Sequence, residues 1–258
     1  MTAPTKVALV TAASAGLGAA IVRSLAPHYR VVVNYFSRAE KAQDLIDDAS
    51  ATIPPQYRLA ANTPRFHAIK ADASSRPDLQ RLVSETVATM GRLDVVVSNN
   101  GWTRLTDFMD LEDQVREEDW DRCFDVNVKG HLWLLYAAKP HLEKSEGGGA
   151  FVTVASLAGV RPSGSSLPYS VTKAAEIHLT KGLAMICGKS VRCNSVSPGL
   201  MMTEWGERFP KAKVEATKAK SALKDTATPE DVAEQVKYLV MSKSITGQNI
   251  VIDCGIAI

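Results

Sequence analysis

The sequence predicts an α/β fold, a doubly wound, seven-stranded parallel sheet with helices on both faces. Two observations support this prediction. Short runs rich in valine, such as 31–33 and 95–97, alternate with segments of helical periodicity along the chain. These runs are apolar at nearly every position, which is typical of parallel strands buried on both faces. Because crossovers between parallel strands are right-handed, such an alternation builds the doubly wound arrangement.

The expected elements follow one another as strand and helix. Each strand is a short run of β-branched or otherwise apolar residues, bounded by turn-forming or charged residues. The expected strands are 6–11, 30–35, 65–70, 93–98, 150–155, 191–197 and 249–253. A glycine-bearing turn after the first strand leads into a helix. Helical periodicity then covers 39–49, 76–90, 117–141 and 168–186.

Two connections are unusually long. Residues 50–64 contain three prolines and predict an exposed excursion rather than a domain boundary. Residues 200–228 follow the sixth strand and have a helical composition rich in alanine and lysine. Because this segment follows the carboxyl end of a strand, we expect a lid over a site. Its five lysines between 211 and 224 are expected to form a solvated helix face rather than an anion-binding patch.

Composition and charge limit the classes of function. The chain has 258 residues, 45% of them hydrophobic, which is enough for one well-buried domain spanning 1–258. Its 30 Lys and Arg residues nearly balance 28 Asp and Glu, so nucleic acid is not an expected partner. Without an apolar leader or a long apolar run, we expect no membrane span and a cytoplasmic location. The four cysteines lack metal-ligand spacing and are expected to be reduced thiols, with no metal site.

The first strand ends in a turn that carries glycines. From Thr11 the chain reads Thr-Ala-Ala-Ser-Ala-Gly-Leu-Gly, with Ser14, Gly16, Leu17 and Gly18 leading into the next helix. Glycine lets the backbone approach a phosphate closely, and a helix N-terminus stabilises the negative charge. In a doubly wound sheet, ligands bind outside the carboxyl ends of the strands. The turn therefore indicates a dinucleotide site, with close helix–strand packing as the alternative interpretation.

A tyrosine and a lysine lie one helical turn apart at Tyr169 and Lys173, and Ser156 follows the fifth strand. A carbonyl that receives a hydride also needs a proton, which a phenol can deliver. A nearby ammonium lowers the phenol pKa, ordinarily about 10, and a serine hydroxyl can hydrogen-bond the substrate oxygen. With Asn127 upstream, these residues indicate proton transfer coupled to hydride transfer. Taken alone, each also has a plainer interpretation as a cap, a packed ring, an exposed cation or a polar helix residue.

The chain resembles the short-chain dehydrogenase/reductase family over essentially its full length. Its turn matches the family's Thr-Gly-x-x-x-Gly-x-Gly motif at Thr11, Gly16 and Gly18, with Ala12 in place of the first glycine. Because alanine has a Cβ, we expect Ala12 to adopt a backbone conformation open to a side chain. The resemblance implies a Rossmann-like fold and a catalytic tetrad, in which the asparagine helps to hold a water that relays protons to the lysine. The residues that match this tetrad are Asn127, Ser156, Tyr169 and Lys173.

Further positions match the family's cofactor contacts. Asn99 and Gly101 follow the fourth strand and resemble the family's Asn-Asn-Ala-Gly, which implies that Asn99 ties the central strands together. Asp72 matches an aspartate near the adenine ring, with an N-cap of the next helix as the alternative. Tyr169 and Lys173 also belong to the implied cofactor contacts. After the sixth strand, the residues that the resemblance places near the nicotinamide are Pro198, Gly199, Leu200 and Thr203.

The end of the second strand bears on the choice between the two nicotinamide cofactors. An acid there binds the ribose 2′-hydroxyl and repels a 2′-phosphate, but the segment Asn-Tyr-Phe-Ser-Arg has none. Ser37 and Arg38 can donate to a phosphate. Asn34 and Tyr35 resemble the Asn-Tyr of NADP-using family members, whereas Ala15 stands where many of those members have a basic residue. We therefore expect NADP(H) in preference to NAD(H).

The expected activity is reduction of a ketone, or oxidation of the matching secondary alcohol, on a small-molecule substrate. The alternative is a dinucleotide-binding protein of the same fold with a regulatory or non-redox biosynthetic role. The resemblance also implies a homo-tetramer or homodimer through the two long helices and the last strand. Candidate apolar contacts there are Trp133, Leu134, Leu135 and Leu183. Side chains expected near the substrate pocket, most of them apolar, are Trp102, Arg161, Leu167, Met201, Met202, Trp205 and Phe209.

Overall fold

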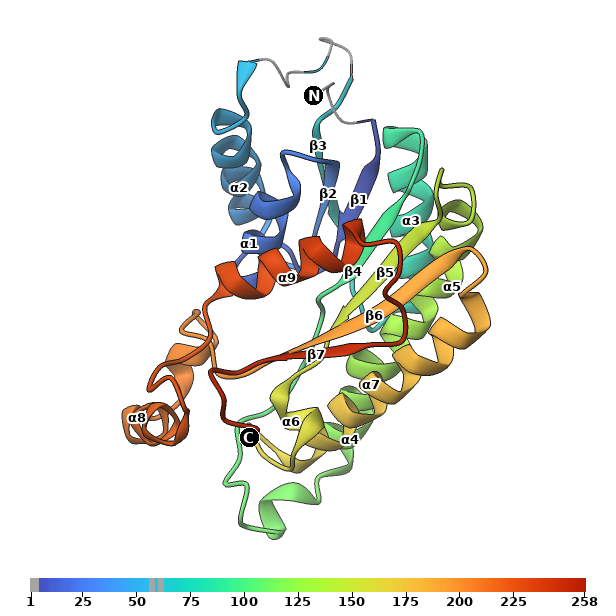
Figure 1. The fold of residues 1–258 in the computed structure, drawn as a ribbon. Coiled ribbons are helices and arrows are strands. Elements are labelled where there is room, and N and C mark those ends of the chain that lie inside the picture. The colour runs from blue at the N-terminus through green and yellow to red at the C-terminus, as the bar shows by residue number, and fades with distance from the viewer. Residues whose placement is uncertain (1–4, 56–58, 60–62) are drawn as a thin grey trace.

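The computed structural model describes residues 5–55, 59 and 63–258. Within them, seven strands form a parallel sheet in the order β3-β2-β1-β4-β5-β6-β7 (Figure 1). The predicted doubly wound fold is therefore confirmed. The strands are β1 (Val7–Val10), β2 (Arg30–Tyr35), β3 (Phe66–Lys70), β4 (Val95–Ser98), β5 (Gly149–Val154), β6 (Val191–Pro198) and β7 (Asn249–Ile252).

Helices cover both faces of the sheet (Figure 1). Buried side chains of α1 (Gly16–Leu25), α2 (Ala39–Ala51) and α9 (Pro229–Met241) form the core on one face. Those of α3 (Arg76–Met90), α5 (Gly130–Leu142) and α7 (Leu167–Cys187) form the core on the other face. Successive residues of β1 point into opposite cores, which explains why the whole strand is apolar. The remaining α-helices are α4 (Glu117–Phe124), α6 (Leu157–Val160) and α8 (Lys211–Lys220).

The order of the strands reverses between β1 and β4. The chain builds β2 and β3 on one side of β1 and then begins again with β4 on the other side. Val10 consequently pairs with Val33 in β2 and with Val97 in β4. At such a switch point, loops leave the carboxyl ends of the strands in opposite directions and open a crevice for a ligand.

Two expectations about the helices need correction, and one further helix was not expected. The single helix expected over 117–141 is α4 and α5, joined by a π-helical turn at Asp125–Lys129. The expected lid contains a 3₁₀ turn at Gly206–Arg208 and α8, which is largely exposed, and is followed by α9, a helix that the sequence analysis did not name. Helix α2 also runs into the expected excursion at 50–64, of which 56–58 and 60–62 lie outside the described residues.

The structure also bears on membrane and metal binding. In the part of the chain that it describes, no helix is both long and apolar enough to cross a bilayer. Cysteines 123, 187, 193 and 254 are all free, and the first three are buried. Among the described residues, no group of three or more His, Cys, Asp or Glu side chains is arranged to hold a metal ion.

Candidate active site

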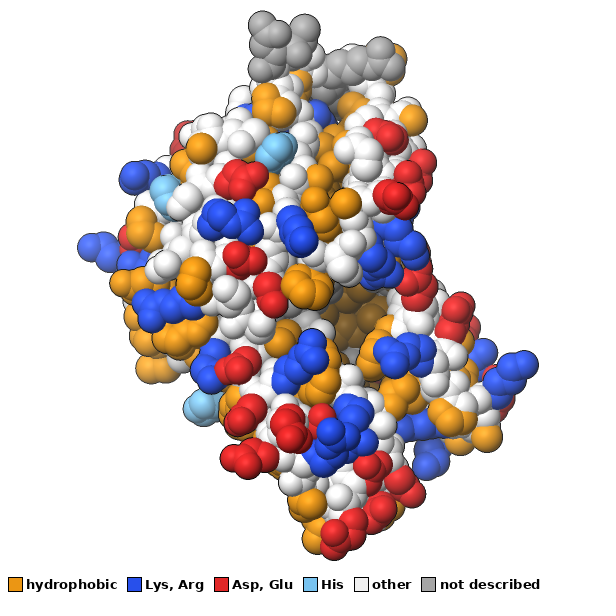
Figure 2. All heavy atoms as spheres, turned by 180° about the vertical axis from the view of Figure 1, so that it is seen from behind, with side chains coloured by type: hydrophobic (Ala, Val, Ile, Leu, Met, Phe, Trp, Pro, Cys, Tyr) orange, Lys and Arg blue, Asp and Glu red, His pale blue; other side chains and the backbone are white. Residues whose placement is uncertain are grey.

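A cleft of about 980 Å³ opens at the carboxyl ends of the central strands. It runs from the glycine turn before α1, past Ser156 and Tyr169, to the segment that follows β6. Figure 2 shows the hollow with apolar side chains inside it and Lys and Arg side chains around its opening. The predicted catalytic residues Ser156, Tyr169 and Lys173 therefore share one cavity with the predicted cofactor turn.

The cofactor turn fits a pyrophosphate closely. Helix α1 begins at Gly16, and its N-cap residue Ala15 makes no side-chain capping bond, so the cap side chain does not occupy the first-turn amides. A Cβ added at Gly18 would lie only 2.5 Å from the carbonyl oxygen of Ala12 and 2.8 Å from Nδ2 of Asn99. Gly18 is therefore required for the close approach of helix, strand and turn, and Ala15, Gly16, Leu17 and Gly18 line the cleft.

Ala12 departs from the expected conformation. Its φ is +47°, in the left-handed region that favours glycine, so this position is not open to a Cβ without strain. The surrounding bonds hold it there, because its amide donates to Oδ1 of Asn34 at 3.0 Å and its carbonyl accepts from Asn99 at 3.1 Å. The family's glycine at this position thus has a physical reason, and the alanine stores backbone strain.

Ala12→Gly is expected to stabilise the protein by about 0.5–1 kcal/mol, because relief of left-handed strain exceeds the extra unfolded-state entropy of glycine. Urea denaturation measures the change in the free energy of unfolding. The matched control is Ala15→Gly, since Ala15 is extended with φ of −160° and gains no relief. A destabilising Ala12→Gly would contradict the left-handed conformation.

Thr11 and two asparagines join β1 to β4 beside the cleft. Asn99 donates through Nδ2 to the carbonyl oxygens of Thr11, at 3.2 Å, and Ala12. The Thr11 hydroxyl accepts from the Asn99 amide at 2.9 Å and donates to Oδ1 of Asn100 at 2.9 Å. Asn99 therefore links the central strands, and Thr11 is completely buried. Asn100, which the sequence analysis did not select, is part of the same junction.

Asn34 and Asp72 have local structural roles. Asn34 is buried, and its Nδ2 donates to the carbonyls of Ile69 and Ala71 while Oδ1 accepts from Ala12. Its side chain thus bonds to the backbone, and the predicted contact of Asn34 with the cofactor stays a prediction. Oδ1 of Asp72 accepts from the amide and hydroxyl of Ser74. The alternative interpretation of Asp72 as an N-cap is wrong, because Ser75 caps α3.

Two cations lie where the second strand leads into α2. Nη1 of Arg38 donates to Oε2 of Glu204 at 2.6 Å, and Lys41 pairs with the other oxygen of the same carboxylate. Glu204 belongs to the expected lid segment 200–228, and both Arg38 and Glu204 line the cleft. Ser37 and Tyr35 precede Arg38, and Ser37 is exposed. The sequence analysis missed Lys41 and Glu204, because only the fold brings the lid beside α2.

The lid begins against the cofactor turn. The Gly199 amide donates to Ile252 in β7 at 2.8 Å, which fixes the path of the chain after Pro198. A Cβ at Gly16 would lie 3.6 Å from the side chain of Thr203, so the lid and the turn face each other at close range. Leu200 and Thr203 both line the cleft, and their contact with the nicotinamide stays a prediction.

The predicted catalytic residues Ser156, Tyr169 and Lys173 come from the segment after β5 and from α7. Ser156 follows β5 as the N-cap of α6, and its Oγ accepts from the Ala158 amide at 3.1 Å. The capping interpretation of Ser156 therefore holds, and the side chain still lines the cleft. Tyr169 is partly buried, while Nζ of Lys173 lies 5.7 Å from the centroid of its ring. Lys173 is only 2% exposed, which excludes an ordinary surface cation.

Asn127 is held inside the π-helical turn between α4 and α5. Its Oδ1 accepts from the Trp102 amide at 2.7 Å, and its Nδ2 donates to the Trp102 carbonyl at 2.9 Å and to the Thr172 hydroxyl at 3.0 Å. The side chain therefore joins the loop after β4 to α7. Gly101 lies between these groups, since a Cβ there would be 3.5 Å from Nζ of Lys173.

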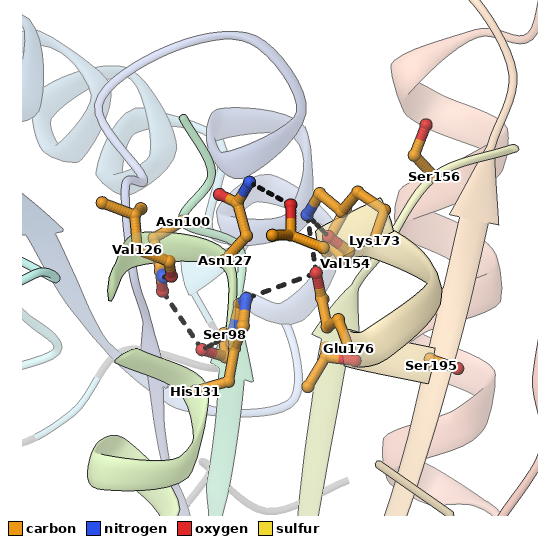
Figure 3. Close-up of polar contacts among 12 residues, drawn as sticks. Ser98, Asn100, Val126, Asn127, His131, Val154, Ser156, Lys173, Glu176 and Ser195 are labelled. Atoms are coloured by element: carbon orange, nitrogen blue, oxygen red, sulfur yellow. Dashed lines mark hydrogen bonds and ion pairs between the residues drawn. The ribbon is translucent and has the colours of Figure 1, made fainter. Parts of the chain in front are cut away.

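A buried polar network lies behind Lys173 (Figure 3). Nζ of Lys173 donates to the Val154 carbonyl at 2.7 Å and to Oε2 of Glu176 at 2.8 Å. Nε2 of His131 lies 3.4 Å from the same carboxylate oxygen, and Nδ1 lies 2.6 Å from Oγ of Ser98. Neither Glu176 nor His131 is exposed to solvent. The sequence analysis missed this pair, although a glutamate three residues after Lys173 on one helix was a usable signal.

The charges in this network support one another. Burial raises the pKa of the Glu176 carboxyl, but His131 and Lys173 outweigh burial and hold that pKa below its usual value. Burial likewise lowers the pKa of the Lys173 ammonium, but Glu176 and Tyr169 outweigh it and keep that pKa above its usual value. Lys173 is therefore a cation and Glu176 an anion at neutral pH.

The candidate oligomer contacts need correction. Leu134, Leu135 and Leu183 are at most 6% exposed and belong to the core. Trp133 is partly buried, with the guanidinium of Arg76 4.3 Å from its ring centroid. The exposed apolar side chains on α4, α5 and α7 are instead Phe124, Tyr136, Val171, Met185 and Ile186.

Residues 11–257 match a family model described as enoyl-(acyl carrier protein) reductase. The chain is also 35% identical to human dehydrogenase/reductase SDR family member 4, over 97% of this chain and 87% of that protein. It belongs to the short-chain dehydrogenase/reductase family. Among the similar relatives is a protein assigned as granaticin polyketide synthase ketoacyl reductase 2, from Streptomyces violaceoruber. The two are 38% identical over 96% of this chain and 95% of that one.

Solved structures of the family share the fold. A short-chain dehydrogenase from Burkholderia cenocepacia in complex with NADP aligns with a TM-score of 0.87 and 30% identity. The alignment covers 100% of both chains. A short-chain dehydrogenase/reductase from Serratia marcescens gives the same TM-score, identity and coverage. Solved members of the family thus share the fold over the whole length of this chain. That fold holds Ser156, Tyr169 and Lys173.

Proposed function

We propose that this protein uses NADP(H) to interconvert a ketone and a secondary alcohol, with Tyr169 as general acid and base. The protein is an NAD(P)-dependent oxidoreductase acting on CH–OH groups. This assignment rests on its family and on relatives named as ketoacyl and 3-oxoacyl-(acyl-carrier-protein) reductases. One observation supports the proposed reaction and the role of Tyr169. Tyr169 lies in the cleft that begins at the glycine turn, with the charged Lys173 beside it.

The residues of the cleft fit a nicotinamide dinucleotide. The amides of α1 and the close approach at Gly18 suit a pyrophosphate, and Arg38 and Lys41 suit a further phosphate. When bound, the nicotinamide supplies or accepts the hydride. Thr203 and Leu200 line the same cleft and are proposed to hold the nicotinamide end.

The protein's own residues then manage the proton. Tyr169 donates its phenolic proton to the substrate oxygen during reduction and takes it back during oxidation. Lys173 stabilises the phenolate form through its positive charge. Ser156 hydrogen-bonds the substrate oxygen and so orients the carbonyl. Asn127 keeps the Trp102 loop and α7 in register and is proposed to support the return of the proton through the relay that the family resemblance implies.

The pocket wall suggests the kind of carbonyl compound. Trp102, Leu157 and Phe209 provide apolar surface, whereas Arg161, Arg208, Lys213 and Lys220 place cations around the cleft. The predicted solvated face of α8 therefore also contributes charge to the site. This combination favours an apolar ketone that carries an anionic group at some distance from the carbonyl.

A carbonyl panel tests the proposed function. Ketones with apolar chains, each as a carboxylate and as its neutral ester, are incubated with NADPH and NADH in parallel while nicotinamide oxidation is followed. We expect turnover with at least one ketone, faster with NADPH and with the carboxylate. NADPH binding without any oxidation across the panel would favour the alternative of a non-redox dinucleotide-binding protein.

Arg38→Ala is expected to lower kcat/KM for NADPH by about 10- to 100-fold, because a charged hydrogen bond to phosphate is lost. The value for NADH should change far less, since NADH has no 2′-phosphate. Steady-state kinetics with both cofactors measure the ratio. Arg116→Ala, at an exposed arginine outside the cleft, is the matched control. Equal losses with NADPH and NADH would contradict the assignment of Arg38.

We also propose self-association in the cytoplasm, as a homo-tetramer or homodimer. The support is the exposed apolar surface on α4, α5 and α7, where Met185 is 88% and Ile186 77% exposed. The proposed interface therefore uses different side chains from those that the sequence analysis named.

A further inference from the structure

Glu176 places a fully buried negative charge directly behind the proposed proton-transfer pair. Its Oε2 lies 2.8 Å from Nζ of Lys173, and the carboxylate has no exposed surface. Figure 3 shows the two side chains converging from α7, with the Val154 carbonyl as the second acceptor for the ammonium. An ordinary structural carboxylate could pair with any cation, but this one pairs with the lysine assigned to tune Tyr169.

The surroundings of Glu176 favour its ionised form. The Lys173 ammonium donates to Oε2 at 2.8 Å, and Nε2 of His131 lies 3.4 Å from the same oxygen. The Ser98 hydroxyl donates to Oδ1 of Asn100 and therefore accepts from Nδ1 of His131 at 2.6 Å. Oε1 of Glu176 has no hydrogen-bond partner within the described residues. The carboxylate is therefore held through Oε2 alone, by the ammonium of Lys173 and the facing imidazole of His131.

We propose that Glu176 is a positioning residue that raises the proton affinity of the Tyr169–Lys173 pair. It thereby extends ketone reduction to higher pH and confines alcohol oxidation to more alkaline pH. The inference rests on the proposed function, because it concerns the same proton transfer.

The direction of the effect does not depend on which member of the pair loses the proton. Loss of one proton leaves either phenolate beside ammonium or phenol beside neutral amine, and both forms carry one positive charge fewer. A fixed negative charge close by makes that loss less favourable in either case. Reduction requires the protonated pair and oxidation requires the deprotonated pair. The limbs of the two profiles of kcat against pH therefore shift in the same direction.

The other groups that face Glu176 do not reverse this effect. Glu176 interacts with Lys173 on its own helix and with His131 on α5. Tyr169 and, on α4, Cys123, whose thiol pKa burial raises to about 11, act on Lys173 instead. Strands β4, β5 and β6 present neutral groups here, among them Ser98, Val154 and Ser195 (Figure 3). Among the described residues, Glu176 is the carboxylate that forms an ion pair with the ammonium.

The decisive variant is Glu176→Gln, which removes the charge and keeps the shape. Profiles of kcat against pH for ketone reduction and alcohol oxidation should both shift toward acid by about one to two pH units. Glu176→Leu removes the same charge without leaving a buried amide unpaired and should shift them equally. The matched control is Glu143→Gln, on the exposed end of α5, which should leave both limbs in place. Unshifted limbs in a folded Glu176 variant overturn the proposal.

The variant His131→Gln tests whether the pH profiles report the imidazole of His131 or the Tyr169–Lys173 pair. His131 also faces Glu176, so pH profiles that reported the imidazole would also shift when the charge of Glu176 is removed. Glutamine does not titrate. If the limbs report the Tyr169–Lys173 pair, they persist in this variant, and their disappearance would overturn the assignment.

Infrared spectroscopy of the wild-type protein tests the ionisation of Glu176 without substrate or cofactor. The Glu176→Gln minus wild-type difference spectrum at neutral pH should contain the loss of a carboxylate band. Loss of a protonated carboxyl band would overturn the proposal. If the variants do not fold, site-specific carboxyl labelling of the wild type gives the same information. An absence of NADPH-dependent turnover would instead count against the proposed function and leave this measurement valid.

Discussion

Tyr169→Phe is expected to lower kcat for ketone reduction by about 10²- to 10⁴-fold, the usual contribution of a positioned general acid. The variant loses the phenolic proton while keeping the ring that lines the cleft. Because the tyrosine ring is retained, NADPH affinity should change by less than about threefold, less than one neutral hydrogen bond. Stopped-flow reduction and NADPH fluorescence titration measure the two quantities separately.

The control for this variant is Tyr238→Phe, which removes a hydroxyl from a tyrosine of α9 that is 58% exposed. It should have wild-type kinetics. Near-normal turnover in Tyr169→Phe would remove Tyr169 from the mechanism, and loss of NADPH binding together with turnover would show that the hydroxyl serves binding rather than proton transfer.

Lys173→Met is expected to abolish measurable turnover and to destabilise the fold by about 3–5 kcal/mol, the cost of leaving a buried charge without its partner. Glu176 is the group left behind, since it is fully buried and its carboxylate accepts from Lys173. Guanidinium denaturation gives the loss in the free energy of unfolding. The effect exceeds that of removing an exposed lysine, because most surface ion pairs contribute at most about 1 kcal/mol.

A double variant separates charge from packing in this prediction. Lys173→Met combined with Glu176→Gln removes both charges, so most of the lost stability should return while turnover remains absent. Lys139→Met, in an exposed pair with Glu143, is the matched control for lysine removal. If the double variant is no more stable than Lys173→Met alone, Glu176 is not the buried anion that the structure indicates.

Most of the fold was predictable because its signals are local. Valine runs such as 31–33 and 95–97 report burial on both faces, and each lies in a strand of the predicted sheet. The spacing of Tyr169 and Lys173 on one helix face similarly places them together without knowledge of the rest of the chain. Helix α9 was missed although Thr228 caps it and Pro229 begins it, which are usable start signals.

The remainder of the site depends on packing between distant segments. His131 meets Glu176 only because α5 and α7 cover the same face of the sheet at a particular rotation. Glu204 meets Arg38 only because the fold brings the lid beside α2. The left-handed φ of Ala12 follows from bonds to Asn34 and Asn99, which sequence patterns do not report. Leu134 appeared available for an interface because periodicity does not distinguish a core face from a contact face.

The central claim is that a substrate ketone receives hydride and a Tyr169 proton in this cleft. It is tested most directly by reducing a ketone from the panel with NADPH carrying deuterium at nicotinamide C4. We expect deuterium on the carbinol carbon of the alcohol from the wild-type enzyme, and at least about 100-fold less alcohol in the same time from Tyr169→Phe that still binds NADPH. Alcohol formed without deuterium from either nicotinamide face, or formed equally well by Tyr169→Phe, would contradict the account.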